Sequence, residues 1–269
     1  MQVQTTVPEL TSVPQYASMD NLRFMLFDVH HIEALSQYEH FGHFDRSTID
    51  MTIDSAKQIA DKHMFPYFEE MDRFGCQYED GKVTIHPHMR TIMQEMGQGG
   101  WIGSTASFDI GGMQMPAMLY TAGEFIFEAA NNSVVGYPGL TSGAARLIYS
   151  FGSPELIDTY VPHMFAGKWQ GTMALTEPES GSSLSDIVTS AKETAEGHYL
   201  IDGQKIFISS GDHDAVDNVV HLMLARSKAH PLAPKAFLFS WSRKCARMRM
   251  VIWYPMMLLL PGFSIKWDR

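Results

Sequence analysis

The spacing of apolar residues changes once along the chain, near residue 167, and this change limits the folds open to it. Before that point apolar residues recur every three or four positions, which is typical of amphipathic helices. After it, short apolar runs between glycines and charged residues predict strands. Helices followed by strands indicate two packed units and argue against alternating βαβ units. We therefore predict an α+β protein, all-helical first and β second.

Local signals place the ends of several elements. Asp20 is the predicted N-cap of a helix that runs to Val29, and Ser153 caps another that has Pro154 in its first turn and Gly167 past its end. An Asp-Gly pair inside 76–85 predicts a hairpin or a loop. The predicted helices are 20–29, 31–41, 45–73 with a kink or an end at Pro66, 88–97, 116–131, 141–151 and 154–166. The predicted strands are 170–175, 187–193, 198–201, 205–209 and 218–226.

Composition excludes several classes of protein. The chain has 269 residues, of which 45% are hydrophobic and 19% charged, so a sizeable core is expected. A net charge of −10 argues against nucleic acid as a partner, and two cysteines build no disulfide framework, which favours a reducing, cytoplasmic setting. The longest apolar run, Val251–Leu260, is shorter than the roughly 20 residues that span a bilayer, and the polar first twenty residues lack a signal-peptide core.

Common catalytic motifs are missing. The sequence has no G-x-G-x-x-G after a strand, no phosphate-binding G-x-x-x-x-G-K-[ST], no H-E-x-x-H and no G-x-S-x-G. Residues 212–214 (DHD) are the nearest thing to a metal motif, but three consecutive side chains do not easily point at one ion. We predict no metal site.

Two segments carry the functional signal. Residues 173–183 (MALTEPESGSS) join a strand to a loop rich in hydroxyls and glycine, which can offer N–H and O–H donors to carbonyl or phosphate oxygens. Alone, the composition of this segment favours an ordinary surface loop. About 30 residues later, residues 202–211 (DGQKIFISSG) join a turn to an aromatic residue and two serines.

Together these segments resemble the acyl-CoA dehydrogenase family, whose motifs read [aliphatic]-T-E-P-x-x-G-S-D and G-x-K-x-[FWY]-I-[ST]. The resemblance covers about residues 14–235 and is similar to the larger subclass that includes methylthiopropionyl-CoA dehydrogenase. Features of that subclass are residues 20–24 (DNLRF), 76–81 (C-x-x-E-D-G), 99–101 (GGW), 137–141 (YPGLT), 211–214 (GDHD) and 221–226 (HL-x-LAR).

The resemblance implies a flavoprotein that uses FAD to dehydrogenate the α and β carbons of an acyl-CoA thioester, a reaction of fatty acid metabolism. In the family a carboxylate takes the α proton and the flavin N5 takes the β hydride. The implied FAD contacts are Met173, Leu175 and Thr176 along the ring, Gly181 and Ser182 at the pyrophosphate, and Phe207 and Ser209 over and beside the ring, with Ser182 also an implied substrate contact.

This sequence departs from the family motifs at two positions. Ser183 replaces the usual Asp, which affects the loop's own capping bond more than flavin contact, and Ser209 stands where Thr is common. Glu177 is expected to orient the loop rather than to catalyse. Phe207 as plain core and Ser182 as a plain turn residue are the alternatives to their flavin roles.

The resemblance implies a domain structure with no catalytic residue in this chain. Its expected parts are an arm and short helices (1–41), a helical domain (42–166), a partial, barrel-like β domain (167–235) and a tail (236–269). The family's catalytic Glu lies in a C-terminal helical domain that we expect to be absent here. Implied partners are acyl-CoA, electron-transfer flavoprotein as acceptor, and further copies in a homodimer or larger oligomer of the full-length protein.

The tail differs from the rest in charge and in pattern. The segment from Ala236 to Arg269 contains six basic residues and one acidic residue, which gives it a net charge of +5. The family string K-G-I-S-L-F-L-V-P-K, absent from the printed frame, is permitted when the third base of each codon from Lys235 is read with the first two of the next. Residues 264–268 likewise permit H-K-M-G. We predict that residues from about 236 are translated out of frame; a genuine alternative terminus is the other interpretation.

Two other functions remain open: a non-catalytic module that binds acyl-CoA or a partner, and a fragment left unstable by open sheet edges. Residues 113–120 and 125–127 either line an acyl pocket or pack in the core.

Overall fold

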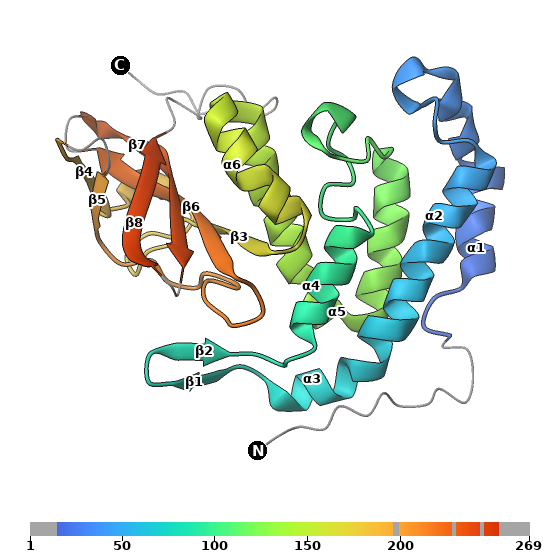
Figure 1. Cartoon of the computed structure of the whole chain (residues 1–269), viewed down its shortest axis with the longest axis horizontal. Coiled ribbons are helices and arrows are strands. Elements are labelled where there is room, and N and C mark those ends of the chain that lie inside the picture. The colour runs from blue at the N-terminus through green and yellow to red at the C-terminus, as the bar shows by residue number, and fades with distance from the viewer. Residues whose placement is uncertain (1–14, 196–198, 228–229, 243–244, 253–269) are drawn as a thin grey trace.

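The computed structural model of the chain describes residues 15–195, 199–227, 230–242 and 245–252, with side chains up to Arg226. Figure 1 shows the helices on one side and a curled sheet on the other, with α6 and β3 at their boundary. The predicted α+β order of helices before strands is confirmed, and the sheet has the form of an incomplete barrel.

The helical part contains six described α-helices and one hairpin. The helices are α1 (Met19–Arg23), α2 (Arg46–Ile59), α3 (Phe68–Phe74), α4 (Met89–Gln98), α5 (Ala117–Phe151) and α6 (Pro154–Phe165), and the hairpin is β1 (Gln77–Glu79) with β2 (Lys82–Thr84). Short π-helical turns (Phe24–Val29, Ala60–Met64) and 3-10 turns (Ile32–Gln37, Glu39–Phe41, Phe65–Tyr67, Phe108–Ile110) connect them. None of the described helices is long and apolar enough to cross a membrane.

Capping side chains fix the helix ends. Ser153 accepts a hydrogen bond from the Leu156 N–H at 3.4 Å, so the predicted cap of α6 is confirmed. The predicted cap of the first helix is wrong. Ser18 accepts from the Asn21 N–H at 3.3 Å, and Asp20 lies two residues further on, within the first turn, where a carboxylate interacts favourably with the positive end of the helix.

Helix α5 replaces two predicted helices. The backbone continues from Ala117 to Phe151 with one interruption at Asn131, where φ is −164° and ψ is 88°. The Asn131 side chain is buried and donates to the Met64 carbonyl oxygen at 3.3 Å, across the molecule in a π-helical turn. A long-range hydrogen bond therefore accompanies the kink, and no local sequence signal gives its position.

The sheet places β6 at its centre. Its strands are β3 (Trp169–Ala174), β4 (Ser190–Glu193), β5 (Tyr199–Asp202), β6 (Asn218–Ser227), β7 (His230–Ser242) and β8 (Cys245–Ile252), with a 3-10 turn at Leu184–Asp186. Along one path the order is β5-β4-β6-β7-β8, and β3 also pairs with β6, in parallel. The segment from 175 to 217, between β3 and β6, adds β4 and β5 to the sheet, and its loops contain most of both motif segments.

Two predicted strands differ from the structure. The strand predicted at 187–193 begins only at Ser190, because the two preceding N–H groups donate to the Glu177 carboxylate instead of to a strand. The strand predicted at 205–209 does not form. Phe207 has φ +57°, a left-handed conformation that interrupts extended backbone.

One hydrophobic core joins the helical part to the sheet. Strand β3 lies so close to α5 that a Cβ on Gly171 would be 2.6 Å from the Cβ of Ala144. The Gly171 N–H also donates to the Thr141 hydroxyl on α5 at 3.1 Å. The core cluster of the helices continues into β6 through Val219, Val220 and Leu222. The position of β3, and of the loop after it, is therefore fixed by the helices.

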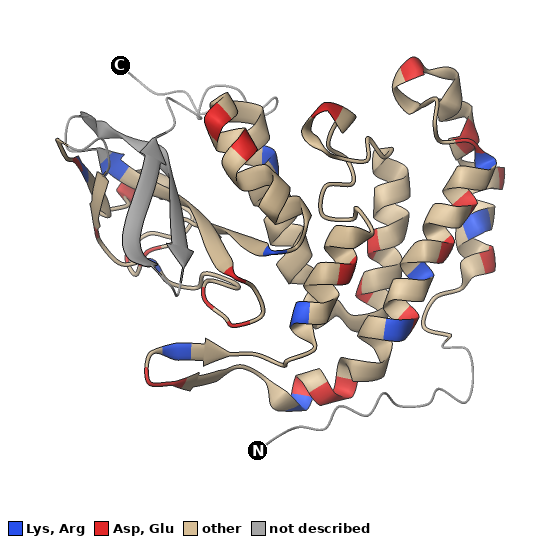
Figure 2. Cartoon of the chain, viewed as in Figure 1, with Lys and Arg blue, Asp and Glu red and all other residues tan. Residues whose placement is uncertain are grey.

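Charged residues of both signs are interspersed over the helices and the hairpin (Figure 2). Near the start of the described chain, Tyr16 donates to Asp61 at 2.7 Å, and Asp61 also pairs with Lys57 at 2.5 Å. The Lys57 ammonium lies 4.5 Å from the centre of the Tyr16 ring. These contacts hold the N-terminal segment against α2 and the turn that follows it.

Three histidines lie beside α4, of which His63 and His86 are buried and His88 is half-buried. The His88 ring stacks on Tyr67, with ring centres 3.6 Å apart, and lies 5.7 Å from the ring of His63. The charged neighbours are Glu70, 3.1 Å from His86, and Glu95, 3.8 Å from His63. Burial, together with the nearby His63 and His86, lowers the pKa of His88 to about 4, and burial also lowers the pKa of His63.

These histidines predict that acid destabilises the fold. In the unfolded chain His88 binds a proton near the ordinary histidine pKa of about 6.5, whereas in the folded chain it does so only as pH nears 4, so stability falls through that interval. His88 should contribute about 2 kcal/mol to the difference between urea unfolding at about pH 7.5 and at about pH 5. His63 and His221, whose pKa values burial also lowers, should add to it. His88→Phe should reduce the difference. His163→Phe, an exposed histidine stacked on Trp169, should not. Equal stability at both pH values would contradict this account.

Candidate functional site

The first motif forms a tight turn directly after β3. The N–H of Glu177 donates to the Ser180 carbonyl at 2.9 Å, and the N–H of Ser180 donates back to the Glu177 carbonyl at 3.1 Å. The Ser180 hydroxyl is buried and donates to the Ser183 carbonyl. The turn thus presents Gly181 and Ser182 to solvent, with open space where a Cβ on Gly181 would lie.

Glu177 organises this turn from beneath. Its carboxylate is buried and accepts hydrogen bonds from the Val188 N–H at 2.6 Å, the Thr189 N–H at 3.1 Å and the Lys205 ammonium at 2.7 Å. Burial alone raises the pKa of the Glu177 carboxyl, but these donors, Lys205 first, outweigh it and lower the pKa to about 2. The expected loop-orienting role of Glu177 is confirmed by these contacts.

Lys205 joins the second motif to the first. Besides Glu177, its ammonium donates to the Leu175 carbonyl at 2.9 Å. The next residue, Ile206, donates its N–H to the Thr176 carbonyl at 3.0 Å. Two segments about 30 residues apart in the sequence therefore form one surface. Sequence reasoning did not include Lys205 among the site residues, although the lysine of the second family motif was the signal that could have found it.

The predicted site residues lie on this surface with different exposures. Phe207 is 89% exposed, which is unusual for an aromatic side chain, and its position follows from the left-handed backbone described above. The core alternative for Phe207 is therefore wrong. Gly181, Ser182 and Ser209 are exposed, and Met173, Leu175 and Thr176 are half-buried. The surface therefore carries the exposed hydroxyl groups of Ser182 and Ser209 and the uncovered aromatic ring of Phe207.

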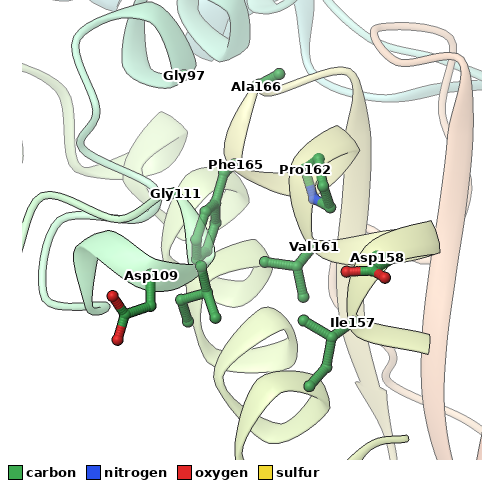
Figure 3. A pocket seen from close by; sticks show the side chains of 10 residues that line it. Gly97, Asp109, Gly111, Ile157, Asp158, Val161, Pro162, Phe165 and Ala166 are labelled. Atoms are coloured by element: carbon green, nitrogen blue, oxygen red, sulfur yellow. The ribbon is translucent and has the colours of Figure 1, made fainter. Parts of the chain in front are cut away.

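Two cavities lie away from these residues. One of about 500 Å³ is lined by α6, the turn at Phe108–Ile110 and the end of α4, with Asp109 and Asp158 beside apolar side chains (Figure 3). The other, of about 230 Å³, is lined by residues including Met71, Cys76 and Tyr137. Neither cavity is lined by a residue of the two motif segments, 173–183 and 202–211.

Residues 113–120 and 125–127, the candidates for an acyl pocket, line neither cavity. Met115, Leu119 and Phe127 are buried in the core, whereas Met113 and Phe125 are 42% and 51% exposed. Core packing accounts for the buried members.

His213 and Asp214, in the segment 212–214, contact the helical part of the molecule. His213 lies edge-on to Tyr137, with ring centres 5.1 Å apart, and Asp214 accepts from the Ile85 N–H at 3.1 Å. Within the described part of the chain, no three His, Cys, Asp or Glu side chains converge as metal ligands would.

Comparison with known proteins identifies relatives. The sequence profile of the family described as "Acyl-CoA dehydrogenase, N-terminal domain" matches residues 47–168. A 3-methylmercaptopropionyl-CoA dehydrogenase of Ruegeria pomeroyi is 30% identical over 213 residues, which is 78% of this chain and 36% of the relative. A butyryl-CoA dehydrogenase of Syntrophomonas wolfei is 33% identical over 66% of this chain and 30% of the relative. The chain thus spans about a third of the length of these relatives.

The fold agrees with the sequence matches. A crystal structure of acyl-CoA dehydrogenase complexed with FAD from Bacillus anthracis superposes with a TM-score of 0.60 at 23% identity, over 79% of this chain and 37% of that one. In sequence and in fold, the chain therefore belongs to the acyl-CoA dehydrogenase family, and residues 47–168 form the family's N-terminal domain.

Proposed function

We propose that this chain supplies the flavin-binding surface of an FAD-dependent enzyme that dehydrogenates acyl-CoA thioesters between the α and β carbons. The observation that carries the proposal is the junction of the two motifs through Lys205 and Ile206, which places Phe207 beside the Thr176 backbone. The names of the relatives support an acyl-CoA substrate.

The residues present fit a flavin. An isoalloxazine ring has an apolar face and a polar pyrimidine edge, and Phe207 offers an uncovered ring while Thr176 and Ser209 offer hydroxyl donors. The exposed turn at Gly181 and Ser182 offers a hydroxyl and open space for a pyrophosphate. FAD supplies hydride acceptance when bound, and the protein contributes its position and polarisation. We assign FAD contact to Met173, Leu175, Thr176, Gly181, Ser182, Phe207 and Ser209.

The carboxylate base is the part of the reaction that we do not place in this chain. Glu177 is fully engaged with Val188, Thr189 and Lys205, and its low pKa leaves it a poor proton acceptor near neutral pH. From the family resemblance, we propose that the base lies in a C-terminal helical domain. On the same ground we propose electron-transfer flavoprotein as the acceptor and a homodimer or larger assembly for the full-length protein.

The reading frame of the tail, residues 236–269, bears on whether such a C-terminal domain is encoded after it. Strand β7 continues in register along β6 across residue 236, pairing Ala236 with Leu224 and Trp241 with Val219. The neighbouring reading frame also permits an apolar, strand-like string at these positions, so a frame change at about residue 236 keeps a strand in this place. We propose that the tail is out of frame. Resequencing the coding DNA tests this, and a verified stop after Arg269 with no family string in the neighbouring frame contradicts it.

The proposed activity is tested with the frame-restored protein. Adding an acyl-CoA without air should bleach the visible band of its bound flavin, because the flavin accepts the hydride. The shorter chain should hold FAD but leave the band unchanged, because we assign no base to it. Anaerobic stopped-flow absorbance measures both. A restored protein whose flavin no acyl-CoA reduces, from short to long chains, contradicts the proposed reaction, and reduction by the shorter chain contradicts the placement of the base.

A further inference from the structure

The segment that follows the second motif is held by the helical part of the molecule. We name Ser210–Asp217 the return loop, because it leads from Phe207 and Ser209 back to β6. It begins with Ser210 in a left-handed conformation, φ +54°. Its other end is fixed by the Asp217 N–H, which donates to the Lys168 carbonyl at 3.0 Å. Whatever fixes this loop also fixes the residues immediately before it.

Tyr137 on α5 contacts the loop at two points. Burial raises the pKa of its phenol, and the Ser210 side chain, which is close enough to affect that pKa, partly opposes the rise. Its ring meets His213 edge-on at 5.1 Å. The Tyr137 main chain is itself held, since its carbonyl accepts from the Thr141 hydroxyl at 2.8 Å and from the Gln170 amide at 2.9 Å. Tyr137 thus connects a rigid helix to the residue that follows Ser209.

Asp214 fixes the middle of the loop. Its carboxylate accepts from the Ile85 N–H at 3.1 Å, and its main-chain carbonyl accepts from the Arg90 guanidinium at 2.9 Å. The same guanidinium lies 3.1 Å from the Asp217 carboxylate. These bonds join positions more than 120 residues apart in the sequence. Local folding of the loop therefore does not explain them.

We propose that Tyr137 and Asp214 are positioning residues that seat the return loop on the helical domain and thereby fix Phe207 and Ser209 for the flavin. This inference rests on the proposed function for its consequence at the flavin. The contacts of the loop stand independently of any cofactor. Tyr137 and Asp214 belong to the subclass segments 137–141 and 211–214, so the role of these segments is to hold the return loop.

The test compares Tyr137→Phe and Asp214→Ala with two matched controls in the present chain. Tyr149→Phe removes a hydroxyl from the same helix at a ring that packs on Phe165. Asp214→Asn keeps an oxygen that accepts from Ile85 and should restore the wild-type behaviour. Loss of one polar contact to the loop should weaken FAD binding about 3- to 10-fold in the first two variants and leave the controls unchanged. The bound flavin should also shift its visible band, which general destabilisation does not produce.

Amide hydrogen exchange without FAD separates this inference from the proposed function. In Tyr137→Phe and Asp214→Ala the exchange of residues 208–217 should accelerate several-fold, while β3 and α5 keep wild-type rates. Unchanged exchange in both variants overturns the inference, as does unchanged FAD affinity with faster exchange. A wild-type chain that binds no FAD contradicts the proposed function, and the exchange result then decides on the seating of the loop alone.

Discussion

Replacing Lys205 with Met is expected to remove about 3–5 kcal/mol of stability, a large part of the roughly 5–15 kcal/mol that holds a domain folded. The side chains of Lys205 and Glu177 are 7% and 2% exposed, with their charged atoms 2.7 Å apart. Removing the ammonium leaves a buried carboxylate without its charge partner. The Leu175 carbonyl also loses a donor. Because the pair joins the two motifs, FAD binding should be lost as well.

Urea unfolding with matched variants measures this effect. Glu177→Gln should also destabilise strongly, because it leaves the buried ammonium unpaired and weakens the bonds to the two strand-side N–H groups. Lys192→Met and Glu179→Gln remove exposed charges of the same kinds and should change stability by less than about 1 kcal/mol. If Lys205→Met is as mild as Lys192→Met, then the junction of the motifs does not depend on this ion pair.

Replacing Gly167 with Ala is expected to prevent stable folding or to cost more than about 3 kcal/mol. Gly167 has φ +66° and lies where the α6–β3 connection meets α4. A Cβ there would lie 1.9 Å from the Met93 carbonyl oxygen, which is main chain and cannot rotate away. The strand that leads into the first motif would have to move away from the helices.

Gly111→Ala is the control for Gly167→Ala, because it introduces backbone strain without a steric clash. Gly111 also has a left-handed backbone, φ +80°, but its Cβ would meet nothing within 4 Å. This variant should lose only the roughly 1–2 kcal/mol of a non-glycine left-handed residue. Thermal unfolding of the two variants should therefore differ clearly. Equal melting temperatures would show that the contact between Gly167 and α4 does not limit the fold.

The sequence predicts the parts of the fold that depend on local chemistry. The amphipathic spacing within α2 and α4, the Ser153 cap and the hairpin at Asp80 are visible in the chain itself, because each depends on residues within a few positions. The kink at Asn131 is not predictable in this way, because it depends on the carbonyl of Met64, 67 positions away.

The candidate site also has a part that local sequence predicts and a part that depends on distant contacts. The motif residues are found by their order and spacing, but their arrangement is not. Extended backbone was predicted at Phe207, whereas Lys205 and Ile206 bind the first motif and the chain turns left-handed directly after them. The seating of the return loop by Tyr137 and Asp214 is also non-local. Residues that hold two segments together become visible only when both segments are placed.

The central claim is that the two motifs form one flavin-binding surface in this chain. The most direct measurement is the absorbance spectrum of the purified chain after incubation with FAD and gel filtration. We predict a visible flavin band that elutes with the protein, and its loss in Lys205→Met. A folded protein, shown by circular dichroism, that elutes colourless after incubation with FAD would contradict the claim.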